Sequence, residues 1–291
     1  MELHYLGTAA AEGAPAVFCD CEKCRYAREK GGKEIRTRSG AMIDGKIKLD
    51  FCPDTYMHML KYGLDFSDVH TILIGHTHPD HFYYFDIQRT AAPNAHPNDN
   101  ALPVTVYGNA RVEEALKPWL KTNKHLAFRR MIPFETVDIE EYAVTALEAV
   151  HAVDKSENGK ENPVVFSDGK TYYRLEEALF YLIEKDGHSI LYAHDTDEFT
   201  PADMEFLAGK KIDIISMDCT NGYLELDYVG HMGAKDNERM REKLIQCGAA
   251  DEHTVFIANP FSHNGLLPYE ELEKLLPDFK ISYDGMKIST K

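Results

Sequence analysis

Four side chains that commonly bind metal ions fall within six consecutive residues of this chain. They follow an apolar run, Val69–Ile74, which we expect to be a strand ending at Gly75. The four side chains are His76, His78, Asp80 and His81. Imidazole and carboxylate groups suit Zn, Mn or Fe, and two neighbouring ions can share such a loop. The alternative is a polar turn that is rich in histidine without binding a metal.

The charge of the chain restricts its partners. Its 291 residues include 32 basic and 48 acidic ones, which gives a formal net charge of −16. This excess repels polyanions, so we expect a small-molecule substrate rather than polymeric nucleic acid. The first residues lack the features of a signal peptide, and no apolar stretch reaches the roughly 18 residues of a membrane span. We therefore expect a cytoplasmic protein.

The hydrophobic pattern predicts an α/β fold. Strands dominate the first half and strand–helix alternation dominates the second, and we expect one domain over residues 1–291. Further strands are predicted at residues 2–7, 41–50 (a hairpin turning at Asp44-Gly45), 103–107, 142–147, 189–193, 212–217 and 254–258, and helices near 54–62, 110–121, 175–184, 201–208, 235–247 and 268–276. Residues 19–38 are interpreted as a loop. The polar segment Asp154–Lys170 follows His151, and we interpret it as an inserted loop near the site rather than a domain boundary.

The loop at residues 75–81 resembles the HxHxDH signature of the metallo-β-lactamase superfamily, and the resemblance extends along nearly the whole chain. Tyr5–Thr8 resembles the family's opening strand and turn, and Leu49–Asp54 resembles the strand before the metal loop. Glu148–His151 stands where the family has its third histidine ligand, and Leu191–Thr196 resembles the strand end whose aspartate bridges two metals. The resemblance implies an αββα sandwich, with two mixed sheets flanked by helices and the site at one edge.

The resemblance also implies a set of catalytic ligands. The set comprises His76, His78 and His151 for one metal, Asp80 and His81 for a second metal, and Asp195 between the two. Two alternatives remain open: His151 could be an ordinary buried histidine, and Asp195 could be the N-cap of a following helix. His194 is not expected to be a ligand, because adjacent strand residues point to opposite sides.

Three of the six cysteines form a compact CxCxxC cluster, made of Cys19, Cys21 and Cys24. In a reducing compartment such a cluster favours a structural zinc site, and zinc requires a fourth ligand. The cluster resembles that of the phosphoribosyl cyclic phosphodiesterase branch of the superfamily. That resemblance implies His263 as the fourth ligand; the alternative is three ordinary reduced thiols. The remaining cysteines, Cys52, Cys219 and Cys247, are expected in the core.

One position departs from the pattern of that branch. In that branch, the segment that corresponds to the one ending at His263 also carries an earlier histidine, which is the last ligand of the second catalytic metal. This chain has Pro260 at that earlier position. Proline has neither a side-chain donor atom nor a backbone N–H. Asn259 could lend an amide oxygen, or His263 could serve the catalytic site and leave the cysteines short of a ligand. We expect one tight catalytic metal and a weakened second one.

A last motif, Gly230-His231-Met232-Gly233, resembles a Gly-His motif of the same branch. The resemblance implies that His231 lies beside the metals and serves as a general acid, and the alternative is a histidine that caps a loop. Asp80 would orient the nucleophile. We therefore expect a metal-dependent phosphodiesterase acting on a small phosphorylated substrate, such as a cyclic phosphate. Another hydrolase of this fold (a thioesterase or lactonase) and an inactive metal-binding or sensing protein remain alternatives, and a homodimer stays open.

Overall fold

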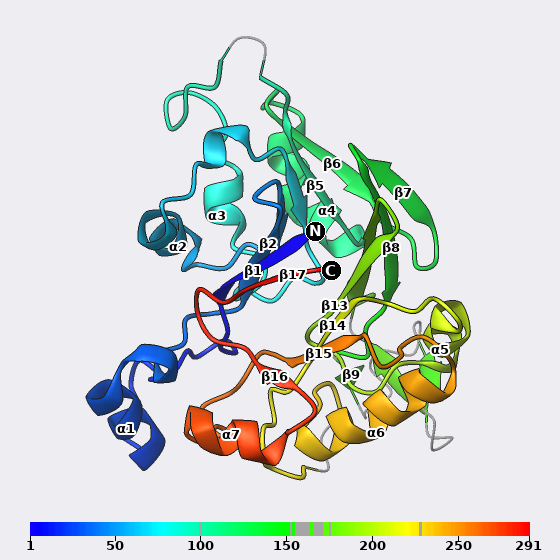
Figure 1. Ribbon diagram of the computed structural model, residues 1–291. Coiled ribbons are helices and arrows are strands. Elements are labelled where there is room, and N and C mark those ends of the chain that lie inside the picture. The colour runs from blue at the N-terminus through cyan, green and yellow to red at the C-terminus, as the bar shows by residue number, and fades with distance from the viewer. Residues whose placement is uncertain (99–100, 152, 155–162, 166–170, 175, 227–228) are drawn as a thin grey trace.

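The computed structural model describes residues 1–291 except 99–100, 152, 155–162, 166–170, 175 and 227–228. In the part of the chain that it describes, two seven-stranded mixed sheets form the centre of the molecule, with helices on their outer sides (Figure 1). A third, three-stranded sheet consists of β9 (Val153–Asp154), β11 (Thr171–Arg174) and β10 (Pro163–Val165). No helix of the described residues is both long and apolar enough to cross a bilayer.

The first sheet contains the N-terminal strands and the last strand of the chain. Its strands, in spatial order, are β17 (Lys287–Ser289), β1 (Glu2–Gly7), β2 (Gly40–Ile43), β3 (Ile47–Leu49), β4 (Thr71–Leu73), β5 (Val104–Gly108) and β6 (Leu126–Arg130). The pairs up to β3 are antiparallel and those from β3 to β6 are parallel. The expected hairpin between β2 and β3 is confirmed: Asp44 and Gly45 both have positive φ, at 50° and 68°, as its tight turn requires.

The second sheet has the same mixed character. Its strands, in spatial order, are β16 (Lys280–Ile281), β15 (Val255–Ala258), β14 (Ile214–Met217), β13 (His188–Ala193), β12 (Leu179–Lys185), β8 (Tyr142–Glu148) and β7 (Thr136–Ile139). Strands β13 to β16 run parallel, and the other pairs are antiparallel. The parallel strands are separated along the chain by helices, which pack on the outer face of this sheet.

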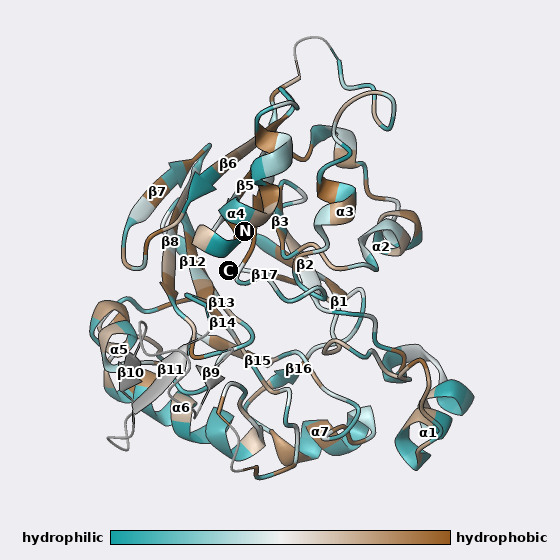
Figure 2. Cartoon of the chain, turned by 180° about the vertical axis from the view of Figure 1, so that it is seen from behind, coloured by the Kyte–Doolittle hydropathy of each residue, from teal (hydrophilic) through white to brown (hydrophobic). Residues whose placement is uncertain are grey.

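The molecule has four layers, two of helices and two of strands, and buried hydrophobic side chains hold them together. The helices are α1 (Glu22–Lys30), α2 (Thr55–Tyr62), α3 (Tyr84–Ile87), α4 (Ala110–Leu120), α5 (Pro201–Leu207), α6 (Ala234–Gln246) and α7 (Tyr269–Leu275), with short 3-10 turns at Gly32–Glu34 and Phe66–Asp68. One buried cluster joins strands of both sheets, a second joins the first sheet to α4, and a third joins the second sheet to α5, α6 and α7. In Figure 2 the hydrophobic colour gathers on central strands such as β8 and β12, whereas the outer helices α1 and α6 show much of the hydrophilic colour. The expected αββα sandwich is confirmed.

Two of the predicted elements are wrong. The helix predicted over residues 175–184 is strand β12, because its apolar run is buried between β8 and β13, and both neighbours complete its backbone hydrogen bonds. The loop predicted over residues 19–38 contains α1. Within the predicted inserted loop Asp154–Lys170, residues 163–165 form strand β10, while residues 155–162 and 166–170 lie outside the described part of the chain.

Candidate metal centre

The sandwich brings together the side chains that the sequence singled out, although they come from both sheets. His76, His78, Asp80 and His81 follow β4 of the first sheet. His151 and Asp195 follow β8 and β13 of the second sheet. Parallel strands present their carboxyl ends at one edge, so residues that follow them can meet there.

The first group consists of His76, His78, His151 and Asp195, whose ligand atoms all lie within 4.8 Å of one another. The Nε2 atoms of His76 and His151 lie 3.6 and 3.7 Å from Asp195 Oδ2. His151 Nε2 lies 3.1 Å from His78 Nδ1. Three imidazole nitrogens around one carboxylate oxygen form a donor set that suits Zn, Mn or Fe.

The second group shares Asp195 with the first and adds Asp80 and His81. His81 Nε2 lies 3.0 Å from Asp195 Oδ2 and 3.3 Å from Asp80 Oδ2. Asp195 cannot be a helix N-cap here, because α5 begins later, at Pro201, and its N-cap is Thr200. The shared carboxylate therefore stands between two groups that could each hold a metal ion, and it also forms a third such group with Asp218 and His231.

The protonation of these side chains fits a cation. Burial opposes the charged form of His81, yet Asp195, Asp50 and Asp80 raise its pKa well above the usual value. A proton on His81 thus occupies the place between carboxylates where a metal ion would supply the positive charge. Burial lowers the pKa of His151 to about 4, so this imidazole is neutral and able to bind a metal. Within the described residues, the buried Nε2 atom of His76 has no hydrogen-bond partner, which is a further sign of a cation site.

Two hydrogen bonds orient the ligand rings from behind. The Nδ1–H of His151 donates to the Gly230 carbonyl at 3.0 Å, which leaves the lone pair on Nε2, the atom facing the group. His81 Nδ1 lies 2.9 Å from Asp50 Oδ2, so this ring also presents Nε2. Sequence reasoning missed Asp50; its one signal is that it directly follows β3, at the same edge of the first sheet as the metal loop.

His231 lies against this centre, as the sequence predicts, with its ring centroid 4.7 Å from that of His151. Its Nδ1 contacts Asp218 Oδ2 at 2.8 Å. Burial lowers the pKa of His231, but Asp218 outweighs it and raises the pKa to about 9. Asp218 is fully buried and also accepts hydrogen bonds from the backbone N–H groups of Thr220 and Met232. Sequence reasoning missed Asp218, which directly follows β14.

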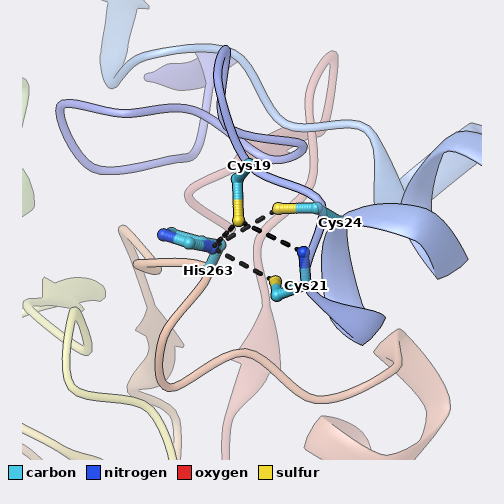
Figure 3. Close-up of side chains that lie close together, drawn as sticks. All are labelled: Cys19, Cys21, Cys24 and His263. Atoms are coloured by element: carbon cyan, nitrogen blue, oxygen red, sulfur yellow. Dashed lines mark hydrogen bonds between the residues drawn. The ribbon is translucent and has the colours of Figure 1, made fainter.

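A separate group lies where α1 meets the segment after β15 (Figure 3). Cys19, Cys21, Cys24 and His263 place their ligand atoms within 4.8 Å of one another. His263 Nδ1 lies 3.8, 3.7 and 3.4 Å from the three Sγ atoms, in that order. A tetrahedral zinc with usual bond lengths would separate nitrogen from sulfur by about 3.5 Å. The geometry fits zinc, and it keeps His263 with the cysteines rather than at the histidine centre.

His263, the one histidine of the segment at 259–263, belongs to the cysteine group rather than to either histidine group. The Asn259 side chain is buried; its Oδ1 accepts a hydrogen bond from Ser282 Oγ at 2.7 Å, and its Nδ2 lies 3.2 Å from His194 Nδ1. His194 contacts Ser216 Oγ through Nε2 at 2.6 Å and, as expected, belongs to neither group. The amide oxygen that could have replaced the missing histidine thus faces Ser282 Oγ.

Comparison with known proteins agrees with this arrangement. A family model described as the β-lactamase superfamily domain matches residues 47–251, about two thirds of the chain. This chain belongs to the β-lactamase superfamily. No curated protein sequence matches it at a significant level. The family match includes every side chain of the two histidine groups but neither the cysteine cluster nor His263.

Solved structures of this superfamily fold extend over the whole chain. A diphosphatase from the PhnP family is 22% identical, with 100% of this chain and 98% of the other covered and a TM-score of 0.71. Zn²⁺-bound PqqB from Methylobacterium extorquens is 15% identical, with 99% and 100% covered and a TM-score of 0.67. The short form of human tRNase Z is 15% identical, with 100% of both chains covered and a TM-score of 0.62. At these identities the likeness establishes the fold alone.

Proposed function

We propose that this protein is a metal-dependent hydrolase that cleaves phosphodiester bonds in a small phosphorylated substrate. The observation that carries the proposal is the location of the Asp218–His231 pair beside two groups of metal-binding side chains that share Asp195. A divalent cation in this centre would supply a Lewis acid and lower the pKa of bound water. The residues named below supply orientation and proton transfer.

His231 has the properties of a general acid. With a pKa raised to about 9 by Asp218, it carries a proton at neutral pH and can donate it to an alkoxide leaving group. Asp218 positions the ring and stabilises its charged form, as a buried carboxylate does for an active-site histidine. Asp80, which lies in the second group with His81 and Asp195, would orient the attacking nucleophile.

Charge and similarity support a small phosphate ester. The net charge of −16 opposes the binding of long polyanions, whereas a cation at the centre attracts a single phosphate group. Two of the similar structures are named as a diphosphatase and a tRNase. The reduced CxCxxC cluster would hold a structural zinc and suits a cytoplasmic location.

The two catalytic ions would be bound unequally. The first group offers three imidazoles and a carboxylate, whereas the second offers Asp80, His81 and the shared Asp195. Because Asn259 is engaged elsewhere and Pro260 has no donor atom, the second ion would lack a fourth protein ligand. We propose that it binds more weakly, or with a ligand from the substrate.

Metal content and turnover, measured together, test this proposal. Purified protein is loaded with Zn²⁺, Mn²⁺ or Fe²⁺, the bound metal is counted by mass spectrometry, and hydrolysis of bis-p-nitrophenyl phosphate is followed. We expect turnover that is lost in His151→Ala and retained in the control His188→Ala, whose half-exposed ring pairs with Asp213 on the surface. A fully metallated protein that hydrolyses no phosphodiester would overturn the proposal in favour of a binding or sensing role.

A further inference from the structure

The ligands of the first metal group depend on the contact between the two sheets. His76 and His78 follow β4, whereas His151 and Asp195 follow strands of the other sheet. The position of the loop at residues 75–81 relative to the second sheet therefore fixes whether the four ligand atoms converge. Metal affinity responds to displacements of a fraction of an ångström, so this contact requires a rigid support.

The beginning of the loop is fixed against β12 by backbone contacts. The Gly75 carbonyl accepts a hydrogen bond from Leu179 N at 2.9 Å, and the Ile74 carbonyl accepts one from the Tyr181 hydroxyl at 2.7 Å. A Cβ atom on Gly75 would lie 2.6 Å from the Leu179 carbonyl oxygen, so no larger residue fits this approach. These contacts hold residues 74 and 75 but do not reach the ligands themselves.

Glu176 makes the contact inside the loop. It precedes β12, is 6% exposed, and accepts hydrogen bonds from both polar groups of Thr77, the residue between the ligands His76 and His78. Thr77 N lies 3.2 and 3.1 Å from the two carboxylate oxygens, and Thr77 Oγ1 lies 2.9 Å from Oε1. Asn109 Nδ2 donates to Oε2 at 3.2 Å. One buried carboxylate thus receives every polar hydrogen that Thr77 offers.

We propose that Glu176 is a positioning residue for the first metal: it fixes Thr77 to the second sheet and so brings His76 and His78 to His151 and Asp195. The inference rests on the metal centre proposed above. A buried carboxylate is costly unless it is fully hydrogen-bonded, and charge-assisted hydrogen bonds are among the strongest in proteins. A simple helix-capping role does not explain it, because Asn109 Oδ1 already caps α4 by accepting from Arg111 N and Val112 N.

Replacing Glu176 by glutamine changes the charge and the hydrogen-bonding pattern of the side chain without changing its shape. The amide has the same size but presents one acceptor oxygen and one NH₂ group. Its NH₂ must face Thr77 N and Thr77 Oγ1 in one orientation, or Thr77 N and Asn109 Nδ2 in the other. In either orientation the NH₂ group faces the Thr77 N–H, which cannot accept a hydrogen bond, although the Thr77 hydroxyl can turn to accept one. The hydrogen bonds that remain also lose the charge of the carboxylate, and the loop is therefore loosened. The adjacent Glu177 is exposed, and Glu177→Gln is the matched control.

The experiment is a Co²⁺ titration of the metal-free full chain in competition with a chelator. Thiolate-to-cobalt charge-transfer absorption reports the cysteine group, and the bound cobalt in excess of that amount, counted by mass spectrometry, reports the histidine group. We expect Glu176→Gln to weaken cobalt binding by about 10-fold at the histidine group, the size expected when support behind metal ligands is lost. Binding at the cysteine group and the melting temperature of the metal-free chain should not change, nor should either affinity in Glu177→Gln.

The outcomes separate the two proposals. Wild-type protein that binds no cobalt at the histidine group would overturn the proposed function itself. Wild-type binding with unchanged affinity in Glu176→Gln would overturn only the positioning role. Equal weakening at both groups, or a lower melting temperature of the metal-free chain, would show a general structural role and also overturn it. If Glu176→Gln does not fold, the same titration on Glu176→Asp decides, because the shorter carboxylate keeps the charge and should still weaken the histidine group alone.

Discussion

Asp218→Asn is the change that bears most directly on the proposed chemistry. In the wild type, Asp218 Oδ2 contacts His231 Nδ1, and Oδ1 accepts from two backbone N–H groups. The asparagine oxygen would remain with those two donors, so its NH₂ would face Nδ1. Two donors cannot share that contact, and the imidazole would have to become neutral, with Nδ1 as an acceptor. The variant keeps the shape of the site and removes its acid.

The size of the effect follows from the pKa of His231. Asp218 raises that pKa from 6.5 to about 9, against burial, which lowers it. The difference corresponds to roughly 3 kcal/mol between the two protonation states. A general acid works below its pKa, so the wild-type rate should decline as the pH rises through about 9. In Asp218→Asn the pKa falls toward the ordinary value of 6.5; at that value the protonated fraction at a pH of about 8 is about 30-fold lower than in the wild type.

The assay compares leaving groups that differ in their need for a proton. An alkyl phosphodiester requires protonation of its alkoxide, whereas p-nitrophenolate leaves without help. We expect Asp218→Asn to lower kcat for the alkyl substrate at least about 30-fold near a pH of 8. The alkaline limb of the pH–rate profile for this substrate should move to lower pH, by about 2.5 pH units. The p-nitrophenyl substrate should change little. Asp213→Asn, at a surface histidine pair, is the control. Equal losses for both leaving groups, or an alkaline limb that does not move, would refute the role of His231 as the acid.

Three further predictions concern metals and stability. Pro260→His should raise the number of bound metals by one, counted by mass spectrometry, because it places an imidazole where the resemblance implies the last ligand of the second metal; an unchanged count would contradict the weakened-site account. Cys24→Ser should lose the structural zinc and, with free zinc at about 100 times its Kd, about 3 kcal/mol of stability in thermal unfolding, whereas Cys247→Ser should retain both. Thr200→Ala removes the capping box of α5 and should cost about 1 kcal/mol in denaturant unfolding; a cost near zero would mean that water replaces the cap.

The metal loop could be predicted from sequence because its information is local. Four ligand-type residues in six positions after an apolar run leave few other interpretations, and the Asp44-Gly45 turn is equally self-contained. Strand β12 shows the limit of such reasoning. Its buried run Leu179–Ile183 lacks the alternation of a half-exposed strand, and a short continuous apolar run fits a buried helix as well as a central strand. The strand is selected over the helix by its pairing with β8 and β13, and this pairing is a tertiary interaction that the local sequence does not encode.

The residues behind the ligands could not be found in this way. Asp50, Glu176 and Asp218 contact partners 31, 99 and 13 positions away, and no sequence period links such pairs. Asp50 and Asp218 do share a signal with Asp195, because each lies within two residues of the end of a buried strand at the site edge. A search for carboxylates at strand ends would have found these two. Glu176 precedes its strand, so even that search would have missed it.

A crystal of the zinc-loaded chain, with an anomalous difference map at the zinc absorption edge, tests the metal centre most directly. We expect one strong peak bounded by His76, His78, His151 and Asp195, and another bounded by the three cysteines and His263. A weaker peak, or none, is expected between Asp80 and His81. A filled cysteine group with no density at the first histidine group would contradict the account, because the hydrolytic centre would then have no metal.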